Sequence, residues 1–302
     1  MRLFLLPIST RRTLIYCERV EPKLAAGSKP PLLDRVTQKV SQTWADWEKS
    51  EEKGINAWKK TVTRYGNAAF KRIPYEEWGL KSVPPLSNKW REVIRKDKPK
   101  IEVLFPGLFL KEQKVPEILE KLALERQPLH RQRMIWSAIG APLTLPFALV
   151  PIIPNIPGFY LLFRAWSHYR AFFGARHLQT LLEHNCAVPR PSSTLDELYA
   201  AGLMNPTRQG TRNAPVPTND EVKRVAELVD GQTNNGTEDV MLLQGWNGKL
   251  IAERFKLPEM EVEVERAVEQ VEKSIKAKEE LMEEKQEIEA ATKPSQAPDT
   301  KK

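Results

Sequence analysis

The stretch MIWSAIGAPLTLPFALVPIIPNIPGFYLLF, Met134–Phe163, decides the fold of this chain. It holds no charged residue over thirty positions, and its plainly polar side chains are Ser137, Thr144 and Asn155. A buried helix of a soluble domain rarely stays apolar on every face for so long, whereas a span of a hydrocarbon core about 30 Å thick needs about 20 apolar residues. The stretch therefore predicts a membrane segment. The alternative is a proline-broken core hairpin in a soluble protein.

Prolines interrupt this stretch, so one straight helix is not expected. They are Pro142, Pro146, Pro151, Pro154 and Pro157. The sequence PIIPNIPG, Pro151–Gly158, is the strongest break, because a residue that precedes proline avoids the helical region. Two arrangements remain open. One is a single kinked span from about Met134 to Pro154, and the other is a hairpin of two short helices with PIIPNIPG, including Asn155, at its tip.

Basic residues border the stretch on both sides: Arg131, Arg133, Arg164, Arg170 and Arg176. Such residues tend to stay on the side from which insertion occurs, and a hairpin keeps both borders there. Arg164 fits less well, because it lies only about 10 Å along a helix from Pro157 and would have to reach the membrane interface. The sequence thus favours a hairpin inserted from one side, with both termini on that side.

Composition and breaks divide the 302 residues into five regions. They are a basic N-terminal α+β region (1–128), a membrane-associated hairpin with an interfacial helix (129–185), a linker (186–218), a helical region with a charged C-terminal helix (219–291) and a disordered tail (292–302). The net charge is +8, and the positive charges concentrate in the N-terminal region. Such an uneven distribution of charge suits an anionic membrane surface near the basic half, a nucleic acid, or simply solubility.

Short apolar runs in the N-terminal region predict a small sheet. Leu3–Ile8 and Thr13–Cys17 flank the turn-like Ser9–Arg12, and Ile101–Phe105 is a third candidate strand. Met1–Val20 also has the basic, acid-poor composition of a mitochondrial presequence. We nevertheless expect this stretch to remain in the mature protein, because it supplies two of the strands.

Helical periodicity accounts for most of the remaining chain. Helices are expected within Pro30–Arg72, Trp166–Glu183, Thr194–Ala201, Asp220–Asp230, Asp239–Phe255 and Met260–Ile288. Ser87 is expected to cap a further short helix, and Pro74–Pro85 and Pro189–Ser193 to form loops. The last long helix has an apolar seam of coiled-coil type, but the seam covers only about two heptads. The predicted fold is mainly α with a small N-terminal β-sheet (α+β), a proline-broken membrane helical hairpin and C-terminal helices.

Motifs that carry chemistry are missing from the sequence. It has no glycine-rich phosphate loop, HExxH, CxxC pair or GxSxG elbow, so we expect no cofactor, no metal and no enzyme activity. His177, His184 and Cys186 are spaced i, i+7, i+9, which is not a recurrent ligand pattern. The two cysteines cannot form a disulfide framework, and this favours a reducing compartment.

Five segments carry a resemblance to a known family. They are Arg2–Cys17, Leu32–Lys60, Ile73–Pro85, the apolar run itself and Phe163–Ala171. In these segments the chain resembles fungal mitochondrial potassium–proton exchange-related proteins, from roughly Met1 to Glu183 and again near Leu257–Lys273. The resemblance implies a mitochondrial protein, expected in the inner membrane, that takes part in matrix potassium homeostasis. It would be part of an exchanger or a factor that the exchanger requires.

A complete antiporter is not expected, because a proton-coupled carrier usually needs an intramembrane carboxylate. No Asp or Glu occurs between Glu125 and Glu183. The expected role is therefore a subunit or regulator of exchange. Its expected partners are the mitochondrial inner membrane and either other membrane subunits or further copies of the chain, and nucleic acid is not expected. The alternative is a structural or assembly factor bound to the inner membrane or the mitochondrial ribosome.

Overall fold

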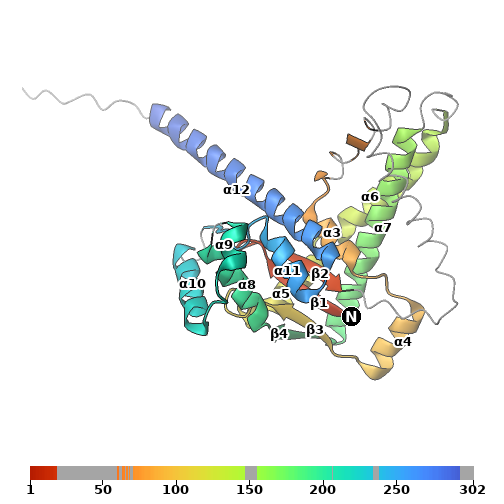
Figure 1. Cartoon of the computed structure of the whole chain (residues 1–302). Coiled ribbons are helices and arrows are strands. Elements are labelled where there is room, and N and C mark those ends of the chain that lie inside the picture. The colour runs from red at the N-terminus through yellow and green to blue at the C-terminus, as the bar shows by residue number, and fades with distance from the viewer. Residues whose placement is uncertain are drawn as a thin grey trace, which may run out of the picture.

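The computed structural model describes residues 1–18, 71–146, 155–205, 207–233 and 238–292, with a few positions between 60 and 68. Most of the helix expected within Pro30–Arg72, the first half of the PIIPNIPG break (151–154) and the C-terminal tail after Thr292 lie outside these residues. In the described part the fold is mainly helical with one small sheet (Figure 1), as the sequence predicts.

A mixed sheet of four strands, in the order β2–β1–β3–β4, forms the centre of the fold. Strands β1 (Arg2–Pro7) and β2 (Thr13–Glu18) pair antiparallel, and β3 (Ile101–Phe105) runs parallel to β1. These are the three predicted strands. The prediction of a loop at Pro189–Ser193 is wrong in part, because β4 (Ala187–Pro191) pairs parallel with β3 at the sheet edge.

Helices cover both faces of the sheet. The first face carries α3 (Tyr75–Ser82), α4 (Asn88–Asp97), α5 (Val115–Leu124), which follows the short η1 (Glu112–Lys114), and α7 (Ile156–Glu183). The second face carries α8 (Ser193–Met204), α11 (Asn247–Phe255) and α12 (Pro258–Thr292). Burial on both faces explains why β1 is apolar at consecutive positions and does not alternate.

The C-terminal region packs on this second face. Its remaining helices are α9 (Arg208–Asn213) and α10 (Asn219–Gln232). The helix predicted from Asp239 begins only at Asn247, because the preceding residues bond to the β1–β2 turn: Thr10 N–H donates to Val240 O at 2.9 Å. The seam of α12 is buried in the second core. This chain therefore covers its own seam, and α12 continues beyond the body as a projecting arm (Figure 1).

The apolar run forms the helical hairpin that the sequence favours. Helix α6 (Gln127–Leu143) packs along the first half of α7, and the two project together from the body (Figure 1). Pro142 lies in the last turn of α6 and Pro157 in the first turn of α7. Pro157 thus lies where the N–H has no partner within the helix, whereas Pro142 removes one of the last N–H donors of α6, which ends at Leu143. Because α6 ends at Leu143 and Asn155 bonds back to Thr144, the described residues favour the hairpin over the single kinked span.

Candidate functional site

Glu77 is a buried carboxylate on α3 that faces the α6–α7 hairpin. Arg164 donates to it twice, from Nη1 to Oε1 at 2.9 Å and from Nη2 to Oε2 at 3.2 Å. Ser167 Oγ donates to Oε1 at 2.5 Å. Burial raises the pKa of Glu77, but the Ser167 hydrogen bond and the Arg164 charge outweigh burial and lower the pKa overall. Arg164 thus has a counter-charge inside the protein and need not reach a membrane interface for one.

The hydrogen bonds of Arg164 also fix the protons on two buried histidines, His168 on α7 and His130 on α6. Arg164 Nη2 lies 2.9 Å from His168 Nε2, and since a guanidinium can only donate, Nε2 accepts. The proton of His168 is therefore on Nδ1, which lies 3.0 Å from His130 Nδ1. His130 must then carry its proton on Nε2. That atom is buried and has no hydrogen-bond partner among the described residues.

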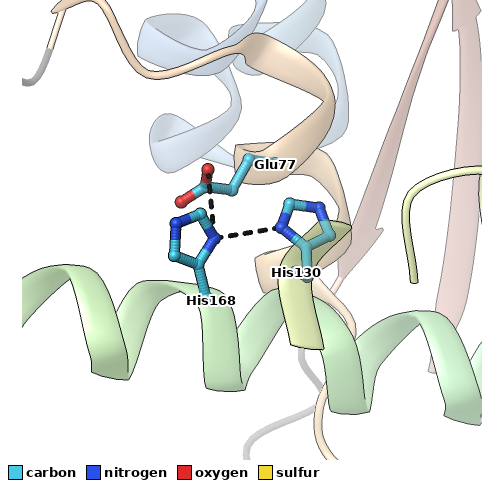
Figure 2. A group of neighbouring side chains, drawn as sticks. All are labelled: Glu77, His130 and His168. Atoms are coloured by element: carbon cyan, nitrogen blue, oxygen red, sulfur yellow. Dashed lines mark hydrogen bonds and ion pairs between the residues drawn. The ribbon is translucent and has the colours of Figure 1, made fainter. Parts of the chain in front are cut away.

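Both histidines are neutral at physiological pH. Burial lowers the pKa of His130 to about 4 and that of His168 to about 4, and the nearby Glu77 charge opposes this shift only in part. The site is thus one ion pair, Arg164 with Glu77, beside two neutral imidazoles. Figure 2 shows Glu77 and the two imidazole rings. It joins α3, α6 and α7 where the hairpin leaves the body.

The close approach of α3 to α7 brings Glu77 within reach of the hairpin. A Cβ atom on Gly174 would lie 2.1 Å from the Leu80 carbonyl oxygen, so only glycine lets the two backbones meet there. Arg164, Ser167 and His168 follow one helical face at steps of three and four residues. The face continues with buried small residues such as Ala171, which keeps α7 close to α3 along its length.

Lys81 forms a second buried charge at the same junction. Its Nζ lies 3.2 Å from the centre of the Trp78 ring and has no hydrogen-bond partner among the described residues. Burial lowers the pKa of Lys81 to about 7, although the Glu77 charge opposes the shift. A cavity of about 190 Å³ adjoins it, lined in part by Trp166 and Glu263. The aromatic rings hold this ammonium in place of a carboxylate.

Of the residues predicted for the membrane segment, those at the far end of the hairpin are Pro142, Pro146, Asn155, Pro157 and Gly158, while Pro151 and Pro154 lie outside the described residues. Met134 and Phe163 are half-buried, and the Phe163 ring lies toward the body, 5.5 Å from Lys81 Nζ, whereas Pro142, Pro146 and Pro157 are exposed. Gly158 is buried against the end of α6. A Cβ atom at this position would lie only 2.6 Å from Thr144 Oγ1.

The predicted basic borders differ in environment. Arg131, Arg133 and Arg176 are exposed, as a membrane-facing role requires. Arg170 is half-buried and donates to the Lys81 carbonyl oxygen at 3.3 Å. Arg164 and Arg170 thus bond to groups within the protein, and a membrane-flanking role for the five arginines stays a prediction.

Asn155 closes the described end of the hairpin. Its Oδ1 accepts from Gly158 N–H at 3.0 Å and so caps α7, while its Nδ2 donates to the Thr144 carbonyl oxygen at 2.8 Å. The side chain predicted at the tip therefore ties the end of α6 to the start of α7. Most of its hydrogen-bonding capacity is used within the protein.

Replacing Asn155 by Ala should lower the free energy of unfolding by about 1–2 kcal/mol, because the cap and the bond to Thr144 are both lost. Asn155→Asp is the matched variant, since it keeps the acceptor for Gly158 but cannot donate to Thr144. It should lose a smaller part of the stability. Urea unfolding of the full chain in detergent measures both changes, and equal stability of Asn155→Ala and the parent would contradict this role.

Large apolar side chains are exposed on the projecting part of the hairpin. On α6 and the turn after it they are Ile135, Trp136, Ile139, Leu143 and Leu145, and on α7 they are Phe159, Tyr160 and Leu162. Leu143 is 73% exposed and Trp136 66%. Exposed large apolar side chains that gather on one projecting hairpin in this way mark a contact with lipid or protein. Among the described helices, none combines the length and apolar character needed to cross a bilayer.

The other candidate metal ligands in the sequence, His177, His184 and Cys186, do not come together in the structure. His177 bonds to the Pro84 carbonyl oxygen, His184 to the Thr180 carbonyl oxygen, and Cys186 lies in the first core. Within the described residues, one group has three potential metal ligands together: Glu77, His130 and His168. Nothing in the sequence pattern groups these three residues, because Glu77 lies 91 positions before His168 in the chain.

Comparisons with known proteins place the chain in a family. The family described as "Mitochondrial K+-H+ exchange-related" matches residues 2–182, which include the sheet strands β1 to β3, the hairpin and the Glu77 site. A protein of Schizosaccharomyces pombe is 30% identical over 188 residues, which cover 60% of this chain and 75% of that protein.

A protein of Saccharomyces cerevisiae is 25% identical over 250 residues, 76% of this chain and 75% of that protein. Both relatives are described only as uncharacterised. No solved structure matches the chain. Because the family match covers more than half of the chain, this protein belongs to the mitochondrial K+–H+ exchange-related family.

Proposed function

We propose that this protein acts in the mitochondrial inner membrane as a subunit or regulator of potassium–proton exchange. The distal end of the α6–α7 hairpin would hold it there. The observation that carries the proposal is the exposed apolar surface at that end, on a chain of the exchange-related family. Exposed Arg131 and Arg133 lie just before this surface on α6, where basic side chains suit anionic headgroups.

A regulator fits the Glu77 site better than a complete antiporter does. An exchanging carboxylate must bind the proton and the cation in turn. Glu77 is the buried carboxylate beside the hairpin, and both of its oxygens already accept hydrogen bonds from Arg164. Releasing Glu77 from Arg164 would leave two buried charges unpaired, at a cost of several kcal/mol. The site therefore supports a role in positioning the hairpin and not in carrying potassium.

Membrane attachment is tested on mitochondria. We expect the protein to remain in the pellet after alkaline carbonate extraction, and tags at both termini to be protected from protease in mitoplasts. Trp136→Glu with Leu143→Glu should release the protein into the carbonate supernatant, because each places a charge in the apolar surface. Trp90→Glu, at an exposed aromatic of α4 in the body, is the matched control and should leave attachment unchanged.

Complete release of the unaltered protein by carbonate would contradict the membrane proposal. Cleavage of one terminus alone would replace the one-sided hairpin by a single span. The subunit or regulator role is tested separately, with the purified full chain in liposomes. We expect no exchange of potassium for protons there, whereas robust exchange at the rate of whole mitochondria would make the chain a complete antiporter.

A further inference from the structure

We propose that Glu77, His130 and His168 bind one divalent transition-metal ion of the Zn²⁺ type. This inference goes beyond the exchange function and does not depend on it. Figure 2 shows the three side chains directed toward one another from three helices, α3, α6 and α7. One ligand atom of each lies within 4.8 Å of the other two, and all three residues are buried.

The distances suit a shared ion. His130 Nδ1 lies 3.0 Å from His168 Nδ1, and His168 Nδ1 lies 3.7 Å from Glu77 Oε2. Two ligands held at about 2.0–2.1 Å from Zn²⁺ in a tetrahedral arrangement are roughly 3.3 Å apart, which falls between these values. An ion would take the place of the proton now shared by the two rings. The third pair of ligand atoms, from His130 and Glu77, also lies within 4.8 Å, so the Glu77 side chain would move toward the two rings to complete the set.

The chemistry of the donors selects the class of ion. Two imidazole nitrogens and one carboxylate oxygen are a common set for Zn²⁺, and three protein ligands leave a fourth position for water. Potassium, in contrast, is held by rings of oxygen atoms. The site therefore would not lie on a potassium path. A bound ion would instead join the hairpin to α3 and fix its direction relative to the body.

Arg164 competes with the ion for this site. A neutral imidazole that binds metal through Nδ1 carries its proton on Nε2, and Arg164 now donates to His168 Nε2. Metal binding therefore requires Arg164 Nη2 to leave the ring and Oε2, while the bond from Nη1 to Oε1 can remain. In the metal-free state, the Arg164 guanidinium is the positive charge that balances the Glu77 carboxylate. Removing it should make metal binding tighter.

Titration of the purified full chain with Zn²⁺, and with Co²⁺ as a spectroscopic probe, tests the proposal. We expect one ion per chain and Co²⁺ absorption bands of a nitrogen-ligated tetrahedral site. His130→Ala and His168→Ala should weaken binding at least about tenfold. Arg164→Met should strengthen it at least about tenfold, because a positive charge next to the ion is removed. His184→Ala, at a histidine outside the cluster, should change nothing.

Two results would overturn the proposal. One is Zn²⁺ binding that is unchanged in both His130→Ala and His168→Ala, which would place the ion elsewhere. The other is a failure of the unaltered chain to bind Zn²⁺ at millimolar concentration, even if the Arg164→Met variant binds it. Cooperative urea unfolding shows whether each variant folds. If a histidine variant does not fold, the Co²⁺ spectrum of the parent and the affinity of Arg164→Met still decide the outcome.

Discussion

A chain that begins at Arg19 should fail to fold, and mitochondria should contain no such form of the protein. Strand β1 is central in the sheet, since it pairs with β2 on one side and β3 on the other. Seven large apolar residues of this segment are almost fully buried: Leu3, Phe4, Leu5, Leu6, Ile8, Leu14 and Ile15. Each contributes about 1.5–3 kcal/mol, so together they match or exceed the usual stability of about 5–15 kcal/mol for a folded protein.

Mass spectrometry of the endogenous protein measures the mature start. We expect peptides that include β1 and β2. Leu5→Asp tests the same point without shortening the chain, because it buries an unpaired charge in the first core, and Arg11→Asp at the exposed turn is its matched control. A stable mature form that starts beyond Val20 would show that the presequence-like composition was the better guide.

Glu77→Gln should lower the free energy of unfolding by about 3–5 kcal/mol, because it leaves Arg164 as a buried charge without its partner. Glu76→Gln is the matched control on the same helix. Glu76 pairs with Arg126 at a more exposed position, so we expect a loss of at most about 1 kcal/mol.

The double variant Glu77→Leu with Arg164→Met separates the ion pair from the rest of the site. Removing both partners should recover most of the lost stability, since no charge is then left unpaired. Urea unfolding of the full chain in detergent measures the parent, Glu77→Leu alone, Arg164→Met alone and the double variant. Additive losses in the double variant would mean that Glu77 and Arg164 do not act as a pair.

The sequence predicts three strands correctly, because their signals are local, and it also indicates the reversal of direction between α6 and α7. Insertion of this hairpin in a membrane stays a prediction. Leu3–Ile8 and Ile101–Phe105 are short apolar runs with clear ends, and the prolines around Pro151–Gly158 leave little room for helix. Strand β4 is missed because it contains Pro189 and Pro191, which argue against a strand. An edge strand tolerates proline where the N–H faces away from the ladder.

Helix α3 is missed for a related reason. The prediction of a loop over Pro74–Pro85 relies on the prolines at both ends, but Pro74 takes the N-cap position and the helix ends before Pro84. This omission hides the candidate site, since Glu77 lies on α3. Arg164 gives the one signal in the sequence, because an arginine so close to an apolar run needs a buried partner. Nothing in the sequence singles out Glu77 as that partner.

Potassium-dependent swelling of mitochondria that lack the protein tests the central claim most directly. The account predicts slow or absent swelling in potassium acetate, restored by the unaltered chain and not by Trp136→Glu with Leu143→Glu, while the Trp90→Glu control restores it. An added electroneutral potassium–proton ionophore should restore swelling in every case. Normal swelling without the protein would contradict a role in potassium–proton exchange.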